Sequence, residues 1–336
     1  MTFSKAVPTL FCMVLLGATF SPCAKADDHD KKTTLAFAAA QAAPPVNNRD
    51  QDDLQFSTEV DLVVLQATVR DRAGHSVPGL GEHDFEVYQD GTLQPIRLFR
   101  HEDTPVTIGL VVDHSGSMRE KLGEVTAAAR TFVRASNPGD QMFVVNFNED
   151  VSLGLPVGMR FSNSADELGT AIWAAPAVGR TALYDAVVEA LQSLQKGDRD
   201  KKALIVISDG GDNASKSSLD RVLKMAEESS AVIYTIGVFS EDDPDQNPRV
   251  LRRLAHETGG EAFFPSKPSE TVAICERIAR AVREQYTIGY SSMNGKPGAY
   301  HAIRVTARSK DHGKLSVRTR AGYIAGGELQ PGKGAK

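Results

Sequence analysis

The middle of the chain alternates between short apolar runs and amphipathic stretches. The apolar runs predict buried strands, at residues 107–112, 141–147, 203–208, 231–238 and 261–264. Between them, apolar residues recur at the three- and four-residue spacing of one helix face. This alternation predicts right-handed crossovers and an α/β fold with a doubly wound, mostly parallel sheet covered on both faces. Residues 151–157 predict a short antiparallel strand at its edge.

The segments on either side of this region have strand patterns with no helix between them. In the first flank, residues 60–69 predict a strand, and Asp90-Gly91 between two strand patterns predicts a hairpin. In the second flank, glycine-containing turns separate strand patterns at 286–290, 302–306 and 315–318. Isolated hairpins are marginally stable in water, so we expect the two flanks to pair into one smaller β-sandwich.

These patterns divide the chain into six parts. We expect a signal peptide at 1–26, a disordered linker at 27–54, β-sandwich segments at 55–103 and 285–325, the α/β domain at 104–284 and a flexible tail at 326–336. The linker is polar and low in complexity, a composition that buries too little apolar surface to offset the entropy of ordering the chain.

The N-terminus has the three parts of a secretory signal. Lys5 precedes an apolar core at 10–20, and Ala24-Lys25-Ala26 is a small-x-small cleavage site. Cleavage predicts a periplasmic or extracellular protein. Cys23 raises the alternative of a lipid anchor, but the preceding Pro22 stands where a lipobox needs a small residue. Cys275 then remains alone and cannot form an internal disulfide, so we expect it to be buried and inert.

Composition argues against two kinds of partner. The formal net charge is -5 and 24% of the residues are charged. The sequence has no basic patch with interleaved aromatic residues, which disfavours nucleic acid. After the signal, no apolar run is long enough for a bilayer, so we expect no stable membrane insertion.

Two of the predicted strands end in a carboxylate. The strand at 107–112 leads into Asp113-His114-Ser115-Gly116-Ser117, and the strand at 203–208 leads into Asp209. A third segment places the hydroxyl of Thr181 at the start of a predicted helix. Ligands of open α/β sheets bind beyond the carboxyl ends of parallel strands. Oxygen donors of this kind suit a hard divalent cation such as Mg²⁺ better than zinc.

Each motif has a simpler interpretation by itself. Asp113, Ser115 and Thr181 are residue types that cap helices, and Asp209 followed by glycine is typical of a turn. Three independent caps would have no reason to fall at one edge of one sheet, so the motifs together favour a metal site. Asp185, one helical turn after Thr181, either orients a metal-bound water or is a favourable charge in the first turn.

The three segments together resemble the metal-ion-dependent adhesion site (MIDAS) of von Willebrand factor A-type (VWA) domains. The resemblance implies a Rossmann-like fold in which Ser115, Ser117 and Thr181 are direct ligands. It also implies that Asp113 and Asp209 hold the metal largely through water. The ion would be Mg²⁺, or else Mn²⁺ or Ca²⁺, and an Asp or Glu carboxylate of a protein or peptide partner would complete its coordination. With its β flanks, the chain is also similar to a group of exported bacterial VWA-related proteins.

We expect no enzymatic activity at this site. Residues 112–116 lack the Gly-x-Ser-x-Gly of a nucleophile elbow, and no phosphate-binding glycine loop follows a strand. We expect His114 to be a loop side chain near the rim of the site rather than a base for Ser115. The predicted function is an exported, metal-dependent module for adhesion or scaffolding. A hydrolase using the same metal, or an assembly module with a vestigial site, is the alternative.

Overall fold

The computed structural model describes residues 60–239, 245–267, 269–293 and 298–325, which all belong to the unit Phe56–Lys336. The expected signal peptide, linker and C-terminal tail lie outside the described residues. Within the described part of the chain, no helix has the length and apolar character required to cross a membrane.

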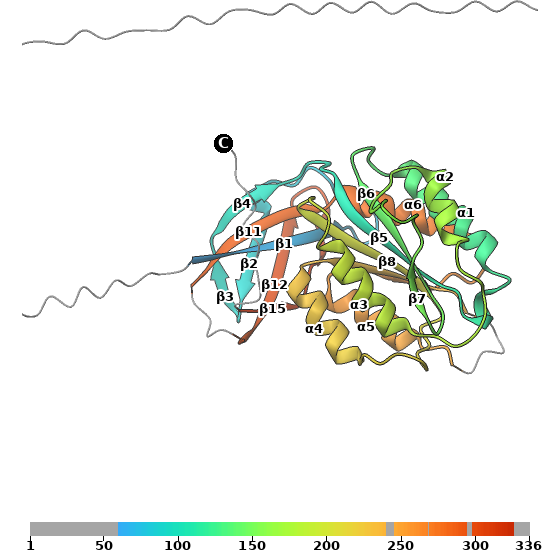
Figure 1. The fold of residues 1–336 in the computed structure, drawn as a ribbon. Helices are drawn as coiled ribbons and strands as arrows, with labels where there is room; N and C mark the ends of the chain where they lie inside the picture. Colours follow the sequence, from blue (N-terminus) through green and yellow to red (C-terminus); the bar gives the residue numbers. More distant parts are fainter. Residues whose placement is uncertain (1–59, 240–244, 268, 294–297, 326–336) are drawn as a thin grey trace, which may run out of the picture. The chain divides into compact units, whose positions relative to one another are not determined.

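A six-stranded sheet forms the centre of the α/β domain (Figure 1). Its strands, in spatial order, are β10 (Ala262–Phe263), β9 (Val232–Gly237), β8 (Lys201–Ser208), β5 (Val106–Asp113), β6 (Gln141–Phe147) and β7 (Val151–Leu153). All neighbours pair in parallel except β7, which is antiparallel to β6. Every residue of β5 is buried, as expected for a central strand covered on both faces. The predicted mostly parallel sheet with an antiparallel edge strand is confirmed.

Six helices surround this sheet. One group packs together as α1 (Leu122–Ala135), α2 (Ala165–Ile172) and α6 (Glu270–Arg283). A second group consists of α3 (Leu183–Leu194), α4 (Leu219–Ser229) and α5 (Pro248–Glu257) (Figure 1). A short 3₁₀ turn, η2 (Gly116–Met118), follows β5. The apolar faces of the helices and both faces of the sheet make one hydrophobic core. This core includes Cys275, whose thiol is free and buried and has a pKa raised to about 12 by burial.

The two flanks form two antiparallel sheets. The first has the order β14 (Ser316–Arg318), β1 (Val60–Arg70), β11 (Tyr286–Met293) and β4 (Ile96–Arg100). The second has the order β13 (Gly313–Lys314), β12 (Tyr300–Ser309), β2 (Phe85–Gln89) and β3 (Thr92–Gln94), with β15 (Gly322–Ile324) also pairing with β12. The short helix η1 (Glu82–Asp84) precedes β2. Each sheet combines strands from both flanks, and the two share one hydrophobic cluster, consistent with a β-sandwich.

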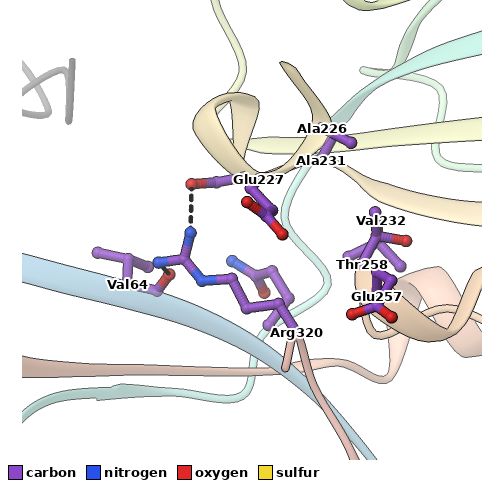
Figure 2. A pocket seen from close by; sticks show the side chains of 10 residues that line it. Val64, Ala226, Glu227, Ala231, Val232, Glu257, Thr258 and Arg320 are labelled. Carbon is purple, nitrogen blue, oxygen red and sulfur yellow. Dashed lines mark hydrogen bonds between the residues drawn. The ribbon is translucent and has the colours of Figure 1, made fainter. Parts of the chain in front are cut away.

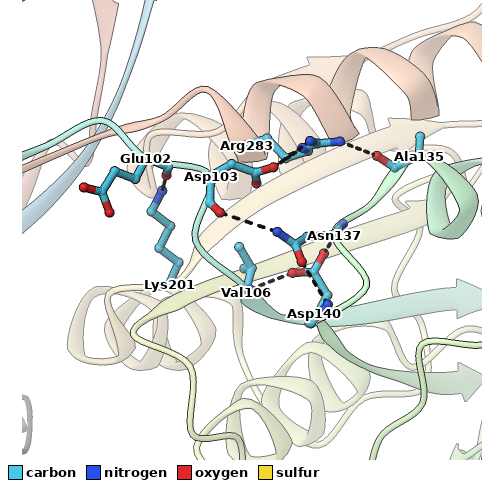
Figure 3. Close-up of polar contacts among 9 residues, drawn as sticks. Glu102, Asp103, Val106, Ala135, Asn137, Asp140, Lys201 and Arg283 are labelled. Atoms are coloured by element: carbon cyan, nitrogen blue, oxygen red, sulfur yellow. Dashed lines mark hydrogen bonds and ion pairs between the residues drawn. The ribbon is translucent and has the colours of Figure 1, made fainter.

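The chain passes between these sheets and the α/β domain twice, and a polar network joins the two connections (Figure 3). Arg283, at the end of α6, donates from Nε and Nη2 to the Asp103 carboxylate, at 2.9 and 2.6 Å. Its Nη1 also donates to the carbonyl of Ala135. The buried Lys201, at the start of β8, donates to the carbonyl of Glu102. The two connections are therefore fixed at the amino ends of β5 and β8.

Arg320 is a second contact between the flanking sheets and the α/β domain. Its guanidinium donates to the Ser230 hydroxyl after α4 and to the Val64 carbonyl in β1, both at 3.0 Å. Figure 2 shows these contacts beside Glu227 and Glu257, which line the same cavity of about 10 Å³. Burial lowers the pKa of Arg320, although the nearby charges oppose this shift.

Replacing the buried Arg320 by Ala should lower the free energy of unfolding by about 2–4 kcal/mol, because it enlarges a cavity and removes two part-buried hydrogen bonds. Urea unfolding measures this difference. The matched control is Arg308→Ala, since the Arg308 side chain is 80% exposed and its ion pair with Glu86 lies at the surface. The control should change stability by no more than about 0.5 kcal/mol. Equal midpoints for the two variants would contradict the role given to Arg320.

Candidate metal centre

Two neighbouring parallel strands deliver the two carboxylates of the site. β5 ends at Asp113, and β8 ends at Ser208, directly before Asp209. Val112 lies opposite Ile207 in the register, so the two strands end at the same edge of the sheet. Asp113 is fully buried and Asp209 is 2% exposed. The topology thus brings together two acidic residues that are distant in sequence.

Hydroxyl groups connect the two carboxylates. The Asp113 carboxylate accepts from the backbone N–H of Ser115 at 2.8 Å and from the Ser208 hydroxyl at 2.6 Å. The Ser115 and Ser117 hydroxyl oxygens are 3.1 Å apart. The Ser117 hydroxyl donates to Asp209 Oδ2 at 2.7 Å. Four of the five predicted ligands therefore lie in one hydrogen-bonded group.

The loop that carries Thr181 is attached to both other motifs. The Gly116 N–H donates to the Gly179 carbonyl at 3.2 Å, and the Thr181 N–H donates to Asn213 Oδ1 at 3.0 Å. The Thr181 carbonyl accepts from the backbone of Asn213. Asn213 lies in the loop after Asp209, so Thr181 is held between the first and third motifs.

Thr181 is buried but does not cap the next helix. The N-cap position of α3 is Ala182, which has no side chain that could accept a hydrogen bond. The interpretation of Thr181 as an N-cap is therefore wrong. The reason is non-local, because the first free N–H groups of α3, at Tyr184 and Asp185, donate to Asp212 Oδ1 and Ser215 Oγ in the loop after Asp209.

Burial and mutual repulsion govern the electrostatics of the site. Burial, followed by the charge of Asp209, raises the pKa of Asp113 to about 6 from an ordinary value of 3.8. Hydrogen bonds from Ser115 and Ser208 partly oppose this shift. Two adjacent buried carboxylates with neighbouring hydroxyls fit a divalent cation, which would relieve their repulsion and use only oxygen donors.

The candidate ligands are hydroxyl and carboxylate groups, and they include no His or Cys side chain. In the residues that the structure describes, no group of three or more His, Cys, Asp or Glu side chains could hold a metal. In the site that the sequence resembles, hydroxyls would be the direct protein ligands, so such a group is not required. The residues present therefore fit a hard cation and do not fit a structural zinc site.

His114 is not at the rim of the site. It is fully buried, and its Nε2 lies 3.1 Å from Asn146 Oδ1. Asn146 uses its Nδ2 to donate to the Ala171 carbonyl at 2.7 Å, so its oxygen faces the imidazole and accepts from Nε2. Burial lowers the pKa of His114. His114 does lie in the loop after β5, but the expected position at the rim is wrong because its ring turns inward to Asn146 of β6.

Asp185 supports the loop that follows Asp209. Its carboxylate accepts from the backbone N–H groups of Lys216 and Ser217, at 2.8 and 2.9 Å. Burial would raise the pKa of Asp185, but these hydrogen bonds outweigh it and lower the pKa. The main role of the Asp185 carboxylate is therefore to hold this loop. This role differs from both interpretations offered by the sequence, the orientation of a metal-bound water and a favourable charge in the first turn of the helix.

Sequence reasoning missed two polar residues of the site. Ser208 donates to Asp113, and Asn146 fixes the orientation of His114. Each is a polar residue that follows an uninterrupted apolar run of its strand, 142–145 in β6 and 203–207 in β8. A buried polar side chain requires a hydrogen-bond partner, so these two positions carried a usable signal.

Comparison with known proteins identifies the domain that carries this site. The family model of the von Willebrand factor type A domain matches residues 107–277, just over half of the chain. The chain belongs to the VWA family. The matched VWA residues contain all three motif segments, from Asp113 to Asp209.

Several solved structures are similar to this chain. One is a von Willebrand factor type A protein from Catenulispora acidiphila, with 14% identity over 80% of this chain and 74% of that chain and a TM-score of 0.47. Another is the vWF domain of the pilus tip protein Mfa5 from Porphyromonas gingivalis, with 13% identity, coverages of 54% and 95% and a TM-score of 0.45. A third is proximal thread matrix protein 1 from the mussel byssus with a zinc-occupied MIDAS motif, with 18% identity, coverages of 59% and 50% and a TM-score of 0.47. A comparison with curated proteins gives no match. The VWA assignment rests on the family match.

Proposed function

We propose that this chain is an exported VWA protein that binds protein partners through a divalent metal ion. In this proposal Ser115, Ser117 and Thr181 are direct ligands, and Asp113 and Asp209 act largely through water. An Asp or Glu carboxylate of the partner completes the coordination. The observation that carries the proposal is the 2.7 Å hydrogen bond from Ser117 to Asp209, which joins motifs 92 residues apart in the sequence.

The charge of the site favours the capture of an anion. Hydroxyl ligands are neutral, so a divalent ion bound directly to them keeps much of its positive charge. Such an ion attracts an acidic side chain from another molecule. Mg²⁺ is the ion we propose first, with Mn²⁺ or Ca²⁺ as alternatives, since all three accept oxygen ligands.

We propose a binding role rather than catalysis. A hydrolase would require a base near Ser115 or near a metal-bound water. The adjacent His114 donates to Asn146 instead and is fully buried, which supports a structural role for this imidazole. The proposed boundaries are 104–284 for the VWA domain and 55–103 with 285–325 for the β-sandwich, with export directed by residues 1–26.

Calorimetric titration of the protein without its proposed signal tests the metal site. We expect one Mg²⁺ or Mn²⁺ to bind per chain, and Ser117→Ala to weaken binding about tenfold or more because a direct ligand is lost. Ser316→Ala is the matched control, since Ser316 is exposed on β14. Absence of a metal-dependent heat in the native protein, or identical titrations for both variants, would reject the proposed site.

A further inference from the structure

One segment of the VWA domain, from β7 to the loop before Thr181, contains most of the exposed large apolar side chains. The described residues expose eight large apolar side chains, and five of them fall between β7 and the loop before Thr181: Leu153, Val157, Met159, Trp173 and Val178. Trp173 is 56% exposed, and it is the only tryptophan of the chain. Contiguous exposed apolar patches mark interaction sites, so the position of these side chains relative to the metal site matters.

The loop at 173–180 lies beside the proposed metal ligands. Its Val178 N–H donates to the His114 carbonyl at 2.9 Å, and its Gly179 carbonyl accepts from Gly116 at 3.2 Å. Arg119 Nε donates to the Ala177 carbonyl at 3.2 Å. These contacts run along the segment that contains Ser115 and Ser117, so the part of the loop that carries the exposed Val178 lies beside the metal site.

Hydrogen bonds also hold the start of this loop. The buried Asn146 donates to the carbonyl of Ala171, two residues before Trp173. The Ala174 N–H donates to the same Ala171 carbonyl at 3.3 Å. The apolar side chains are therefore presented on a fixed backbone, and a partner that binds them orders little of the loop.

The charges on this surface select the kind of partner. Arg119, which follows the first motif, and Arg180, at the end of the 173–180 loop, are both exposed. The carboxyl group of Glu149 lies beside Gly179 of the same loop, where a Cβ would approach it to 3.1 Å. Two exposed cations and one carboxylate therefore lie around this loop, so the proposed metal ion supplies the main attraction for an acidic group and the exposed Trp173 and Val178 supply apolar area.

We propose that the loop at 173–180 binds apolar side chains that flank the partner's metal-binding carboxylate. This inference rests on the proposed function and names its partner class: a protein segment in which Asp or Glu stands next to an aromatic or aliphatic residue. Trp173 and Val178 are the residues that discriminate such a segment from a purely polar acidic one. Burying one large apolar side chain is sufficient for about a tenfold preference.

Four short peptides test the inference. They are acetylated and amidated five-residue peptides, flanked by Gly, with the cores Phe-Glu-Phe, Phe-Gln-Phe, Ser-Glu-Ser and Ser-Gln-Ser. Each is titrated into the ¹⁵N-labelled protein with Mg²⁺ and with chelator, and the indole N–H of Trp173 gives a single assigned reporter. We expect Phe-Glu-Phe with Mg²⁺ to bind about tenfold tighter than Ser-Glu-Ser and to shift the indole signal.

The peptide design separates the two proposals. Equal, Mg²⁺-dependent binding of both Glu peptides would overturn the role of the loop and leave the proposed function intact. Three results would overturn the proposed function and the inference with it. They are binding that is unchanged by chelator, binding that is unchanged when Glu is replaced by Gln, and no binding by any of the peptides.

A double variant gives an independent check. Trp173→Ala with Val178→Ala should remove the preference for Phe-Glu-Phe, measured by calorimetric titration because the indole reporter is absent, and leave Mg²⁺ binding unchanged, since neither residue is a proposed ligand. Leu93→Ala is the matched control because Leu93 is 59% exposed on β3, in the flanking sheets. A preference that survives in the double variant would overturn the inference.

Discussion

Replacing Asp113 by Asn should abolish Mg²⁺ binding and at the same time stabilise the protein in chelator at neutral pH. The loss of binding follows from the removal of one of two anionic groups beside the ion. The stabilisation follows from burial and Asp209, which raise the pKa of Asp113 to about 6. A carboxyl group with a raised pKa favours folding most below its ordinary value of 3.8, and this contribution is lost as the pH rises through about 6.

The size of the effect is set by that shift. About two pKa units correspond to about 3 kcal/mol, and the weakened hydrogen bond from Ser208 offsets part of this gain. We therefore expect Asp113→Asn to raise the free energy of unfolding by about 1–2 kcal/mol at pH 7.5. Urea unfolding in chelator between pH 4 and pH 8 measures it, and the difference from the native protein should grow mainly up to about pH 6.

Asp185→Asn is the matched control for this prediction. Its pKa is lowered, so its contribution is present at neutral pH and is lost as the pH falls. This variant should therefore destabilise the protein at pH 7.5, the opposite sign from Asp113→Asn. If Asp113→Asn were less stable than the native protein in chelator at pH 7.5, the electrostatic account of the site would be wrong.

Replacing Gly210 by Ala should unfold the protein more readily than any surface change and weaken metal binding. Gly210 follows Asp209 and has a φ of +82°. A Cβ there would lie 2.4 Å from the carbonyl oxygen of Asn247, which is backbone and cannot rotate away. We expect a loss of about 3 kcal/mol or more, since backbone strain and a buried clash act together.

Gly158→Ala separates the clash from the backbone conformation. Gly158 also has a positive φ, of +92°, but nothing lies within 4 Å of its would-be Cβ. Its replacement should cost about 1 kcal/mol, the strain alone. Urea midpoints and Mg²⁺ titrations of the two variants test both effects. Similar urea midpoints for Gly210→Ala and Gly158→Ala would show that the backbone around Asn247 moves away from the added Cβ at little cost in free energy.

The architecture places the proposed site far from the flanking sheets. The two connections lie at the amino ends of β5 and β8, where Asp103 pairs with Arg283 and Lys201 binds the Glu102 carbonyl. The candidate ligands lie at the carboxyl ends of the same strands. An eight-residue strand spans about 26 Å. In the proposed function, this distance leaves the metal edge free to meet a partner.

The sequence by itself determined the elements of the VWA domain and indicated the candidate metal ligands. The buried strands could be recognised from continuous apolar runs, because a strand that is buried on both faces has apolar residues at every position rather than at every second one. The Asp90-Gly91 hairpin was equally local: both residues have positive φ, as a two-residue turn of that type requires. The motif at 113–117 was visible because its donors are close together in the chain.

Only the tertiary structure decided which groups satisfy one another. The contact of Ser117 with Asp209, the binding of the Thr181 backbone by Asn213 and the turning of His114 toward Asn146 all join segments distant in sequence. A buried N–H, hydroxyl or imidazole must find a partner, but local sequence does not say which strand or loop provides it. For the same reason the N-cap interpretation of Thr181 and the rim position of His114 were wrong, whereas the strands themselves were correct.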